Sequence, residues 1–198
     1  MQSSVDASYA ERLRKGEAVW WKRLVDVQLP YRLHLRRLEL GFVLDVGCGL
    51  GRNLTNLGGA AAGVGVDPNP DAIATCRERG LVAFTPDELA VSEYAGPERF
   101  DTLLISHVLE HLPADAAAAL IARYLPSIKH GGRAVFITPQ EAGFRSDPTH
   151  LEFVDLARLA QLATAAGLTT VSAYSFPFPR PVGRWFRYNE FVVIARKP

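Results

Sequence analysis

The stretch from Phe42 to Asn53, with the sequence FVLDVGCGLGRN, constrains the fold of this chain more than any other. A run of apolar, β-favouring residues is followed by three glycines at alternate positions and then by a helical pattern. This order predicts a buried strand, a sharp turn and the start of a helix. Because Gly47, Gly49 and Gly51 lack a Cβ, a ligand can approach the backbone of the turn closely. Backbone N–H groups at the helix N-terminus would line its rim.

The spacing of the glycines and two nearby acids narrow the type of ligand. The pattern is G-x-G-x-G, which differs from the G-x-G-x-x-G of dinucleotide binders and from the P-loop. Asp45 lies two residues before the first glycine, at the end of the strand. Asp67 closes the next apolar run and lies 20 residues past Gly47. A ribose-binding acid is expected at about that distance in a nucleotide-binding fold.

At these residues the chain resembles the class I S-adenosylmethionine-dependent methyltransferases. Val43 to Gly51 is similar to the first motif of the family, and Asp67 is similar to the end of its second. S-adenosylmethionine carries no phosphate, so it needs no P-loop lysine, and an acid near its methionyl ammonium would help to bind it. The resemblance implies that the contacts to S-adenosylmethionine come from Asp45, Gly47, Cys48, Gly49, Arg52, Asn53, Asp67, Pro68, Asn69, Asp87, Ser106 and His107.

Composition limits the class of protein. The 198 residues are 48% hydrophobic, which excludes a disordered chain and allows one domain with a sizeable core. No apolar run approaches the roughly 20 residues of a membrane span, and the first eight residues lack the apolar core of a signal peptide. Cys48 and Cys76 make neither a disulfide framework nor a zinc pattern. We therefore expect a cytoplasmic enzyme.

The net charge of +1 is unevenly distributed along the chain. Residues 1–40 hold 8 basic and 5 acidic residues, residues 174–198 hold 5 and 1, and residues 41–173 hold 9 and 15. An acidic middle suits a cationic cofactor, whereas the basic ends suit an anionic or polyhydroxylated substrate or are only solvated. No basic face large enough for a nucleic-acid duplex is expected.

The chain order predicts a Rossmann-like, doubly wound α/β fold. Residues 7–38 read as two helices broken at Pro30, which would cover the cofactor cleft as in the resembled family. Trp20 and Trp21 are expected to pack in this cap, although one of them, or Tyr9, could form a lid. Apolar runs and turn signals predict further strands at 81–84, 100–106, 133–138, 168–176 and 190–196, and helices from 70 to about 79 and from 155 to 166.

The alternation of strands and helices predicts a mostly parallel sheet with right-handed crossovers. The resemblance implies seven strands, helices on both faces and a C-terminal antiparallel hairpin. We expect a single methyltransferase domain over 1–198, with a helical cap at 1–40, a cofactor-binding core at 41–139 and a substrate-side part at 140–198. Asp45, Asp67, Ser106 and Pro139 would converge on the cleft at the carboxyl ends of the strands.

Two stretches of the middle region allow more than one interpretation. Asp87 or Glu88 could accept a hydrogen bond from adenine, but capping of the helix that begins near Pro86 explains both nearly as well. His107-x-x-Glu110-His111 fits the H-x-x-E-H pattern of zinc peptidases. That chemistry needs both histidines on one helical face, whereas His107 directly follows a strand and Pro113 leaves room for barely one and a half turns. We therefore favour structural roles for Glu110 and His111.

The expected chemistry is displacement of the sulfonium methyl by a substrate nucleophile, in which alignment and exclusion of water do most of the work. An alcohol would also need a base. His150, in the loop after the fifth parallel strand, is the leading catalytic candidate, and Asp147 or Glu152 could orient it. Capping of the next helix or a bond to the backbone would equally explain His150. His107 is the second candidate.

The substrate side of the cleft is less defined. Glu141, Arg145, Arg180 and Tyr188 are the candidate substrate-binding residues, and Arg184 could also meet an anion. A magnesium ion on Glu141, Asp147 and His150 would be possible, but the spacing does not support it.

The loop at 146–150 and the Phe-Pro-Phe-Pro segment at 176–179 resemble those of small bacterial methyltransferases that act on sugars, glycolipids or secondary metabolites. We expect O-methylation of a sugar or glycoside. N-methylation of a small amine, a non-catalytic partner that binds S-adenosylmethionine, and a homodimer stay open.

Overall fold

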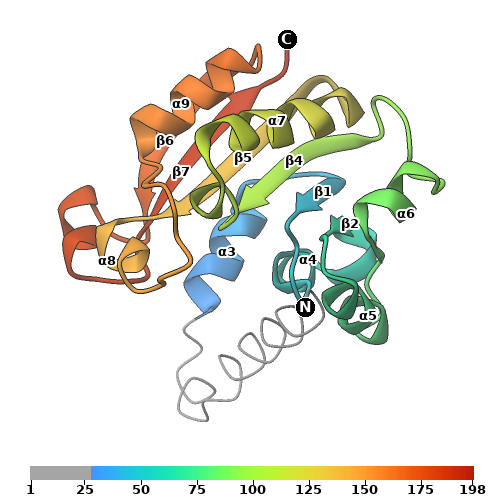
Figure 1. Cartoon of the computed structure of the whole chain (residues 1–198), viewed down its shortest axis with the longest axis horizontal. Helices are drawn as coiled ribbons and strands as arrows, with labels where there is room; N and C mark the ends of the chain where they lie inside the picture. Colours follow the sequence, from blue (N-terminus) through green and yellow to red (C-terminus); the bar gives the residue numbers. More distant parts are fainter. Residues whose placement is uncertain (1–27) are drawn as a thin grey trace.

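The computed structural model describes residues 28–198, in which seven strands form one mixed sheet (Figure 1). The strand order is β3-β2-β1-β4-β5-β7-β6. Strands β1 to β5 are parallel, and β7 runs antiparallel to both of its neighbours. The predicted doubly wound sheet with a C-terminal antiparallel hairpin is confirmed. The strands are β1 (Val43–Val46), β2 (Gly63–Val66), β3 (Ala83–Phe84), β4 (Phe100–Ser106), β5 (Ile128–Pro139), β6 (Thr169–Phe176) and β7 (Glu190–Arg196).

Helices cover both faces of the sheet. On one face α7 and α9 lie side by side, and residues such as Ile121 and Leu159 pack against alternate strand residues (Figure 1). On the other face Leu35 of α3 packs against Val43, Leu104 and Val135. The helices are α3 (Leu29–Arg37), α4 (Arg52–Leu57), α5 (Pro70–Glu78), α6 (Pro86–Ala90), α7 (Ala114–Tyr124), α8 (Glu141–Phe144) and α9 (Leu156–Ala165). The 3₁₀ segments are η1 (Gly59–Ala62), η2 (Leu109–His111), η3 (Leu125–Ser127) and η4 (Arg180–Arg184).

Local capping explains where the helices near the cleft begin. The side chain of Asn69 accepts hydrogen bonds from two backbone N–H groups at the start of α5. Thr85 and Glu88 form a reciprocal capping box at α6. Asp155 accepts from the backbone of Arg158 at the start of α9. These caps fix the residue at which each of the three helices begins.

Several element boundaries differ from the sequence prediction. β3 contains two residues instead of four, because it pairs with β2 only over Gly65 and Val66. β5 begins at Ile128, so the glycine pair at 131–132 lies inside the strand and does not precede it. Pro30 lies in the first turn of α3, consistent with the predicted break. The first predicted helix, with Tyr9, Trp20 and Trp21, lies outside the described residues.

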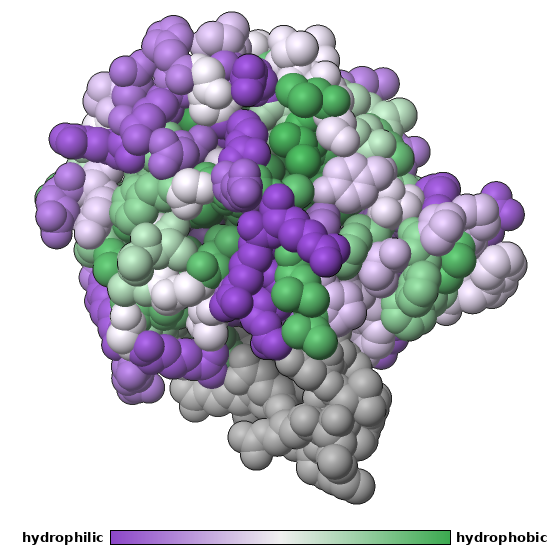
Figure 2. Space-filling model, turned by 180° about the vertical axis from the view of Figure 1, so that it is seen from behind, coloured by the Kyte–Doolittle hydropathy of each residue, from purple (hydrophilic) through white to green (hydrophobic). Residues whose placement is uncertain are grey.

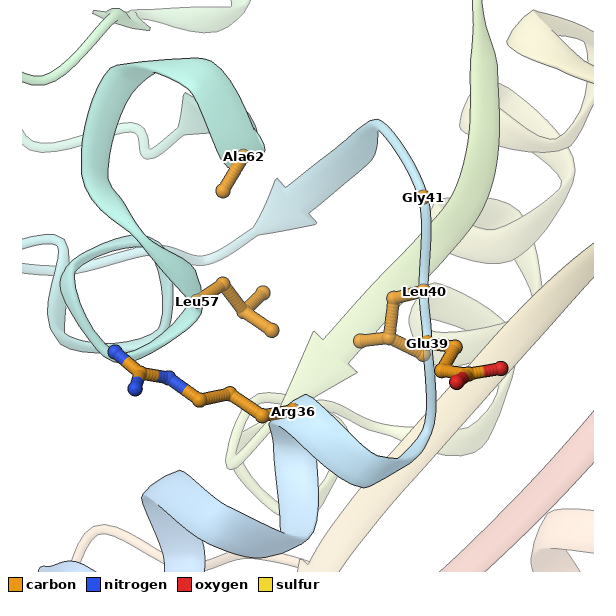
Figure 3. Close-up of a pocket in the computed structure, with 6 residues that line it drawn as sticks. All are labelled: Arg36, Glu39, Leu40, Gly41, Leu57 and Ala62. Atoms are coloured by element: carbon orange, nitrogen blue, oxygen red, sulfur yellow. The ribbon is translucent and has the colours of Figure 1, made fainter.

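A pocket lies beside the segment that leads into β1, at the amino end of that strand, whereas the glycine turn follows its carboxyl end. It is formed by Arg36, Glu39, Leu40, Gly41, Leu57 and Ala62. Figure 3 shows the carboxylate of Glu39 pointing away from Leu57 and Ala62, so the pocket is lined mainly by apolar atoms and the Arg36 side chain. Arg36 is also engaged, because its Nε donates to the carbonyl of Asn56 at 2.7 Å.

The surface shows mixed polarity. Figure 2 shows the face opposite to the one seen in Figure 1, and on it hydrophobic residues are interrupted by hydrophilic ones. Within residues 28–198, no helix is both long and apolar enough to cross a membrane.

Candidate functional site

The glycine turn after β1 adopts backbone conformations that favour glycine. Gly47, Gly49 and Gly51 have φ angles of 73°, 52° and 77°. The N–H groups of Gly47 and Cys48 both donate to the carbonyl of Val66, at 2.8 and 3.1 Å, which ties the turn to β2. A Cβ on Gly47 would lie 2.3 Å from Cγ2 of Val108. The turn therefore packs directly against the segment that follows β4.

Asp67, at the end of β2, organises the same turn. Its Oδ2 accepts from the N–H of Gly49 and its Oδ1 from the N–H of Asn69, both at 2.9 Å. Burial raises the pKa of this carboxyl and the two backbone donors counteract the shift, with a net rise. Because each oxygen uses one acceptor site on the backbone, each retains capacity for a ligand hydroxyl.

Asp45 is fully buried at the end of β1. Its Oδ1 accepts from Nδ2 of Asn53 at 3.1 Å, whereas Oδ2 has no hydrogen-bond partner among residues 28–198. Burial raises the pKa of Asp45 to about 7, despite the opposing effect of the Asn53 amide. A cationic or hydrogen-bonding ligand group would supply the missing partner.

The structure brings most of the other predicted cofactor residues to this edge of the sheet. Cys48 and Asn69 are buried beside the turn, and Ser106 is buried at the end of β4. Arg52 and Pro68 are exposed at the start of α4 and after β2. The roles predicted for these residues stay predictions.

The two acids considered for adenine differ. The Glu88 carboxylate accepts from the backbone of Thr85 and pairs with Arg77 at 2.8 Å, so it is engaged in capping. Asp87 is exposed in the first turn of α6. Of the two, Asp87 is the residue whose side chain remains available for adenine.

His107 lies at the junction after β4, with a left-handed φ of 59°. Its Nε2 is 2.8 Å from Oε1 of Glu190, and its Nδ1 is 3.2 Å from Oε1 of Glu110. Burial alone would lower the pKa of His107, but the two carboxylates outweigh it and raise the pKa to about 9. His107 is therefore a charged hydrogen-bond donor at neutral pH. In addition, it does not share a helical face with His111, as the zinc-peptidase pattern would require.

The His150 side chain lies against η2, the segment that follows β4. Its Nδ1 is 2.8 Å from the carbonyl of Phe144, and its Nε2 is 3.9 Å from Oε1 of Glu110. Its ring lies 4.7 Å from that of His111, measured between centroids. Among residues 28–198, the Asp147 side chain forms no hydrogen bond with His150. The Asp147 backbone carbonyl accepts from the N–H of His150 at 3.3 Å, and its Oδ1 accepts from the backbone and the hydroxyl of Thr149.

The predicted substrate-side residues lie on α8, η4 and the loops around them. Arg180 pairs with Glu141, with 2.8 Å between Nη1 and Oε2. Arg145 donates to the carbonyl of Arg184 at 3.0 Å. Tyr188 is partly exposed, and its backbone carbonyl accepts from the hydroxyl of Tyr31. Glu141 and Arg180 thus neutralise each other in this structure.

Sequence reasoning missed two parts of the site. Gln140 is fully buried and bonds to Ser175, Glu190 and Asn189, so it joins α8 to the C-terminal hairpin. Glu110 and Glu190 were not predicted to enclose His107. The H-x-x-E-H pattern pointed to a contact near Glu110, but no local sequence pattern indicates that Glu190, which is 83 residues from His107, is its other partner.

The fold and this site define a methyltransferase domain. A family model described as "Methyltransferase domain" matches residues 20–173, and the chain belongs to that family. It is 35% identical over 126 residues to a tRNA U34 carboxymethyltransferase from Pseudoalteromonas translucida, covering 60% of this chain and 36% of the relative. It is 30% identical over 145 residues to a ubiquinone biosynthesis O-methyltransferase from Serratia proteamaculans, covering 64% and 59%. The chain thus spans between about a third and three fifths of the length of these curated relatives.

A solved structure shares the fold. The 1,6-didemethyltoxoflavin-N1-methyltransferase from Burkholderia thailandensis, determined with S-adenosylhomocysteine bound, superimposes with a TM-score of 0.64 at 23% identity. The match covers 99% of this chain and 88% of that one.

Proposed function

We propose that this protein transfers a methyl group from S-adenosylmethionine to an oxygen atom of a small polyhydroxylated acceptor, such as a sugar or glycoside. The observation that supports binding of S-adenosylmethionine is the hydrogen bond between Gly49 and Asp67, beside the Asp45 oxygen that has no hydrogen-bond partner among residues 28–198. An open backbone, an acid with spare acceptor capacity and a buried carboxylate lacking a partner fit a ligand that has a ribose and a cationic amino acid. Membership of the methyltransferase-domain family supports the same assignment.

Each predicted contact follows from the chemistry of the chain. Asp67 would accept from the ribose hydroxyls, and Asp45 would meet the methionyl ammonium. Asp87 would be the acid available to the adenine amino group. When bound, S-adenosylmethionine supplies an electrophilic methyl group with a neutral thioether as leaving group.

The segment from α8 to β7 supports an acceptor rich in hydroxyl groups. Phe178, Trp185 and Tyr188 expose 47%, 77% and 39% of their surface beside the paired Arg180 and Glu141. Exposed aromatic rings present an apolar face, and Trp185 and Tyr188 add a polar tip, so they suit the mixed surface of a sugar ring. The name of the Serratia relative also specifies transfer to oxygen.

Oxygen acceptors need help with their proton. His150 is the predicted base, because its Nδ1 donates to a carbonyl, which places the lone pair of the neutral ring on Nε2. In the transfer, the bond between the acceptor oxygen and the methyl carbon forms as the bond between that carbon and sulfur breaks. The hydroxyl proton leaves to the base.

The experiment is methyl transfer from S-adenosylmethionine labelled in its methyl group to a panel of sugars, glycosides and small amines. We expect label in a methyl ether that survives amine-specific derivatisation. Label recovered only in amines would overturn the oxygen assignment. Binding of S-adenosylhomocysteine without transfer to any fraction of a small-molecule extract would favour a non-catalytic partner.

A further inference from the structure

One group of side chains at the carboxyl end of β4 is arranged as a metal site. Glu110, His111 and His150 each offer a ligand atom, and these atoms all lie within 4.8 Å of one another. Glu110 and His111 come from η2, whereas His150 comes from the loop before α9. Chain segments 39 residues apart therefore present their donors to one point.

Glu110 is buried without the hydrogen bonds that a buried carboxylate needs. Its side chain is 0% exposed, and neither oxygen has a hydrogen-bond partner among the described residues. Nδ1 of His107 lies 3.2 Å from Oε1 and forms an ion pair with it, without the alignment of a hydrogen bond, whereas Oε2 has neither a hydrogen-bond nor an ion-pair partner among residues 28–198. Leaving such a group unsatisfied costs stability, and a missing ion is one accepted explanation.

The hydrogen bonds of His111 and His150 suit both imidazoles to metal binding. Nδ1 of His150 is 2.8 Å from the carbonyl of Phe144, and Nδ1 of His111 is 3.2 Å from the carbonyl of Thr149. A carbonyl oxygen can only accept, so each Nδ1 carries a proton, and in the neutral ring each Nε2 has a lone pair for a metal ion. Metal-binding histidines commonly donate their second nitrogen to a carbonyl in this way, which fixes the orientation of the ring.

Asp147 and Thr149 support the ring of His111. The Asp147 carboxylate accepts from both the backbone and the hydroxyl of Thr149, at 2.9 and 2.7 Å. Thr149 in turn contacts His111 through its carbonyl and its hydroxyl. The residue predicted to orient His150 is thus placed to orient His111.

We propose that Glu110, His111 and His150 bind a divalent transition metal ion. Two imidazoles and one carboxylate are the donors that suit Zn²⁺, Co²⁺, Mn²⁺ or Fe²⁺, whereas Mg²⁺ and Ca²⁺ prefer oxygen ligands alone. Three protein ligands leave a coordination position for a further group. Donor atoms of a tetrahedral site lie roughly 3.3 Å apart at ordinary bond lengths. Nε2 of His150 and Oε1 of Glu110 are 3.9 Å apart, so loading requires the ligand side chains to move closer together.

The location gives the ion a function that rests on the proposed O-methylation. Val108, two residues before Glu110, contacts the glycine turn. An ion on this cluster would lie beside the segment that packs on the glycine turn and would lower the pKa of an acceptor hydroxyl that coordinates it. The ion would then replace His150 as the group that activates the acceptor, and the proton would pass to water.

The test uses the full chain, first freed of metal with a chelator and then titrated with Zn²⁺ against a chromophoric competitor. We expect one ion per chain, and an absorption band in the visible region when Co²⁺ replaces Zn²⁺. The variants Glu110→Gln and His150→Ala should each weaken Zn²⁺ binding at least tenfold. His130→Ala is the matched control, because His130 is a 79% exposed histidine outside the cluster.

Absence of stoichiometric binding to the native chain, or equal affinity in the cluster variants and the control, would overturn the proposal. If Glu110→Gln does not fold, His111→Ala at its partly exposed position gives the same comparison. Binding of S-adenosylhomocysteine is measured in parallel. A chain that binds Zn²⁺ but not S-adenosylhomocysteine would retain the metal site and lose the proposed function.

Discussion

The backbone N–H of Gly49 donates to Oδ2 of Asp67 across 2.9 Å, so the acid that ends β2 holds the middle of the glycine turn that follows β1. The other oxygen of Asp67 holds the backbone of Asn69, where α5 begins. A single buried carboxylate therefore joins two parallel strands at the edge where ligands bind in such sheets.

Replacing Asp67 tests this role. Asp67→Ala removes both the predicted ribose acceptor and the support of the turn, and we expect S-adenosylhomocysteine affinity to fall by about 1–3 kcal/mol. Asp71→Ala is the control, because Asp71 is an exposed aspartate at the start of the adjacent helix. Calorimetric titration of the two folded variants should separate them, and equal affinities would remove the ribose assignment.

The close packing of Gly47 gives a second prediction. Gly47→Ala places a Cβ 2.3 Å from Cγ2 of Val108 at a φ of 73°. Gly80 has the same φ, but a Cβ there meets no atom within 4 Å. We expect Gly47→Ala to lower the free energy of unfolding by about 1–3 kcal/mol more than Gly80→Ala, because only the former overpacks. Denaturant unfolding of the pair measures this difference, and equal losses would show that the turn does not depend on this contact.

Asp45 gives a pH dependence. Because its pKa in the folded protein is about 7, against 3.8 for an unperturbed carboxyl, the folded state binds its proton more tightly than the unfolded state. Its contribution to stability is complete below pH 3.8 and is lost as the pH rises through about 7.

Asp45→Asn should abolish this part of the pH dependence. Relative to the variant, the native chain should lose at most about 4 kcal/mol of unfolding free energy across this window, at 1.36 kcal/mol per pKa unit. Urea unfolding at intervals from pH 4 to 8 measures it. A constant difference between the two proteins would contradict the assigned pKa.

The buried Gln140 and its partly exposed neighbour Glu141 give a fourth prediction. Gln140→Ala removes bonds to Ser175, Glu190 and Asn189, and leaves the buried Asn189 amide without one acceptor. We expect a loss of about 2–4 kcal/mol of unfolding free energy, because unsatisfied buried groups cost about 1–3 kcal/mol each. Glu141→Gln should cost less than about 1 kcal/mol, since its pair with Arg180 is partly exposed. Thermal unfolding compares the two, and a greater loss from Glu141→Gln would reverse the ranking.

Local patterns in the sequence were sufficient to predict the cofactor edge of this fold. The structure confirms the predicted strands Val43–Val46 and Phe100–Ser106, which are rich in apolar residues and are each followed by a turn. The position of Asp67 at the end of β2 follows from the same reasoning.

The acceptor side depends on contacts between distant segments. His150 was predicted as a base in a loop that Asp147 or Glu152 could orient, but the burial of Glu110 and the proximity of His111 arise only when that loop packs on η2. The backbone of Leu151 and Glu152 donates to the carbonyl of Glu110, and no periodicity in the sequence encodes that pairing. Gln140 likewise finds its partners 35 to 50 residues away.

The central claim is that the glycine turn binds S-adenosylmethionine, and titration of the full chain with that compound tests it most directly. Parallel titrations with NAD⁺ and ATP cover the two other ligands that glycine-rich turns hold. The account predicts one molecule of S-adenosylmethionine per chain, and no saturable binding of NAD⁺ or ATP. Saturable binding of either nucleotide with none of S-adenosylmethionine would contradict it.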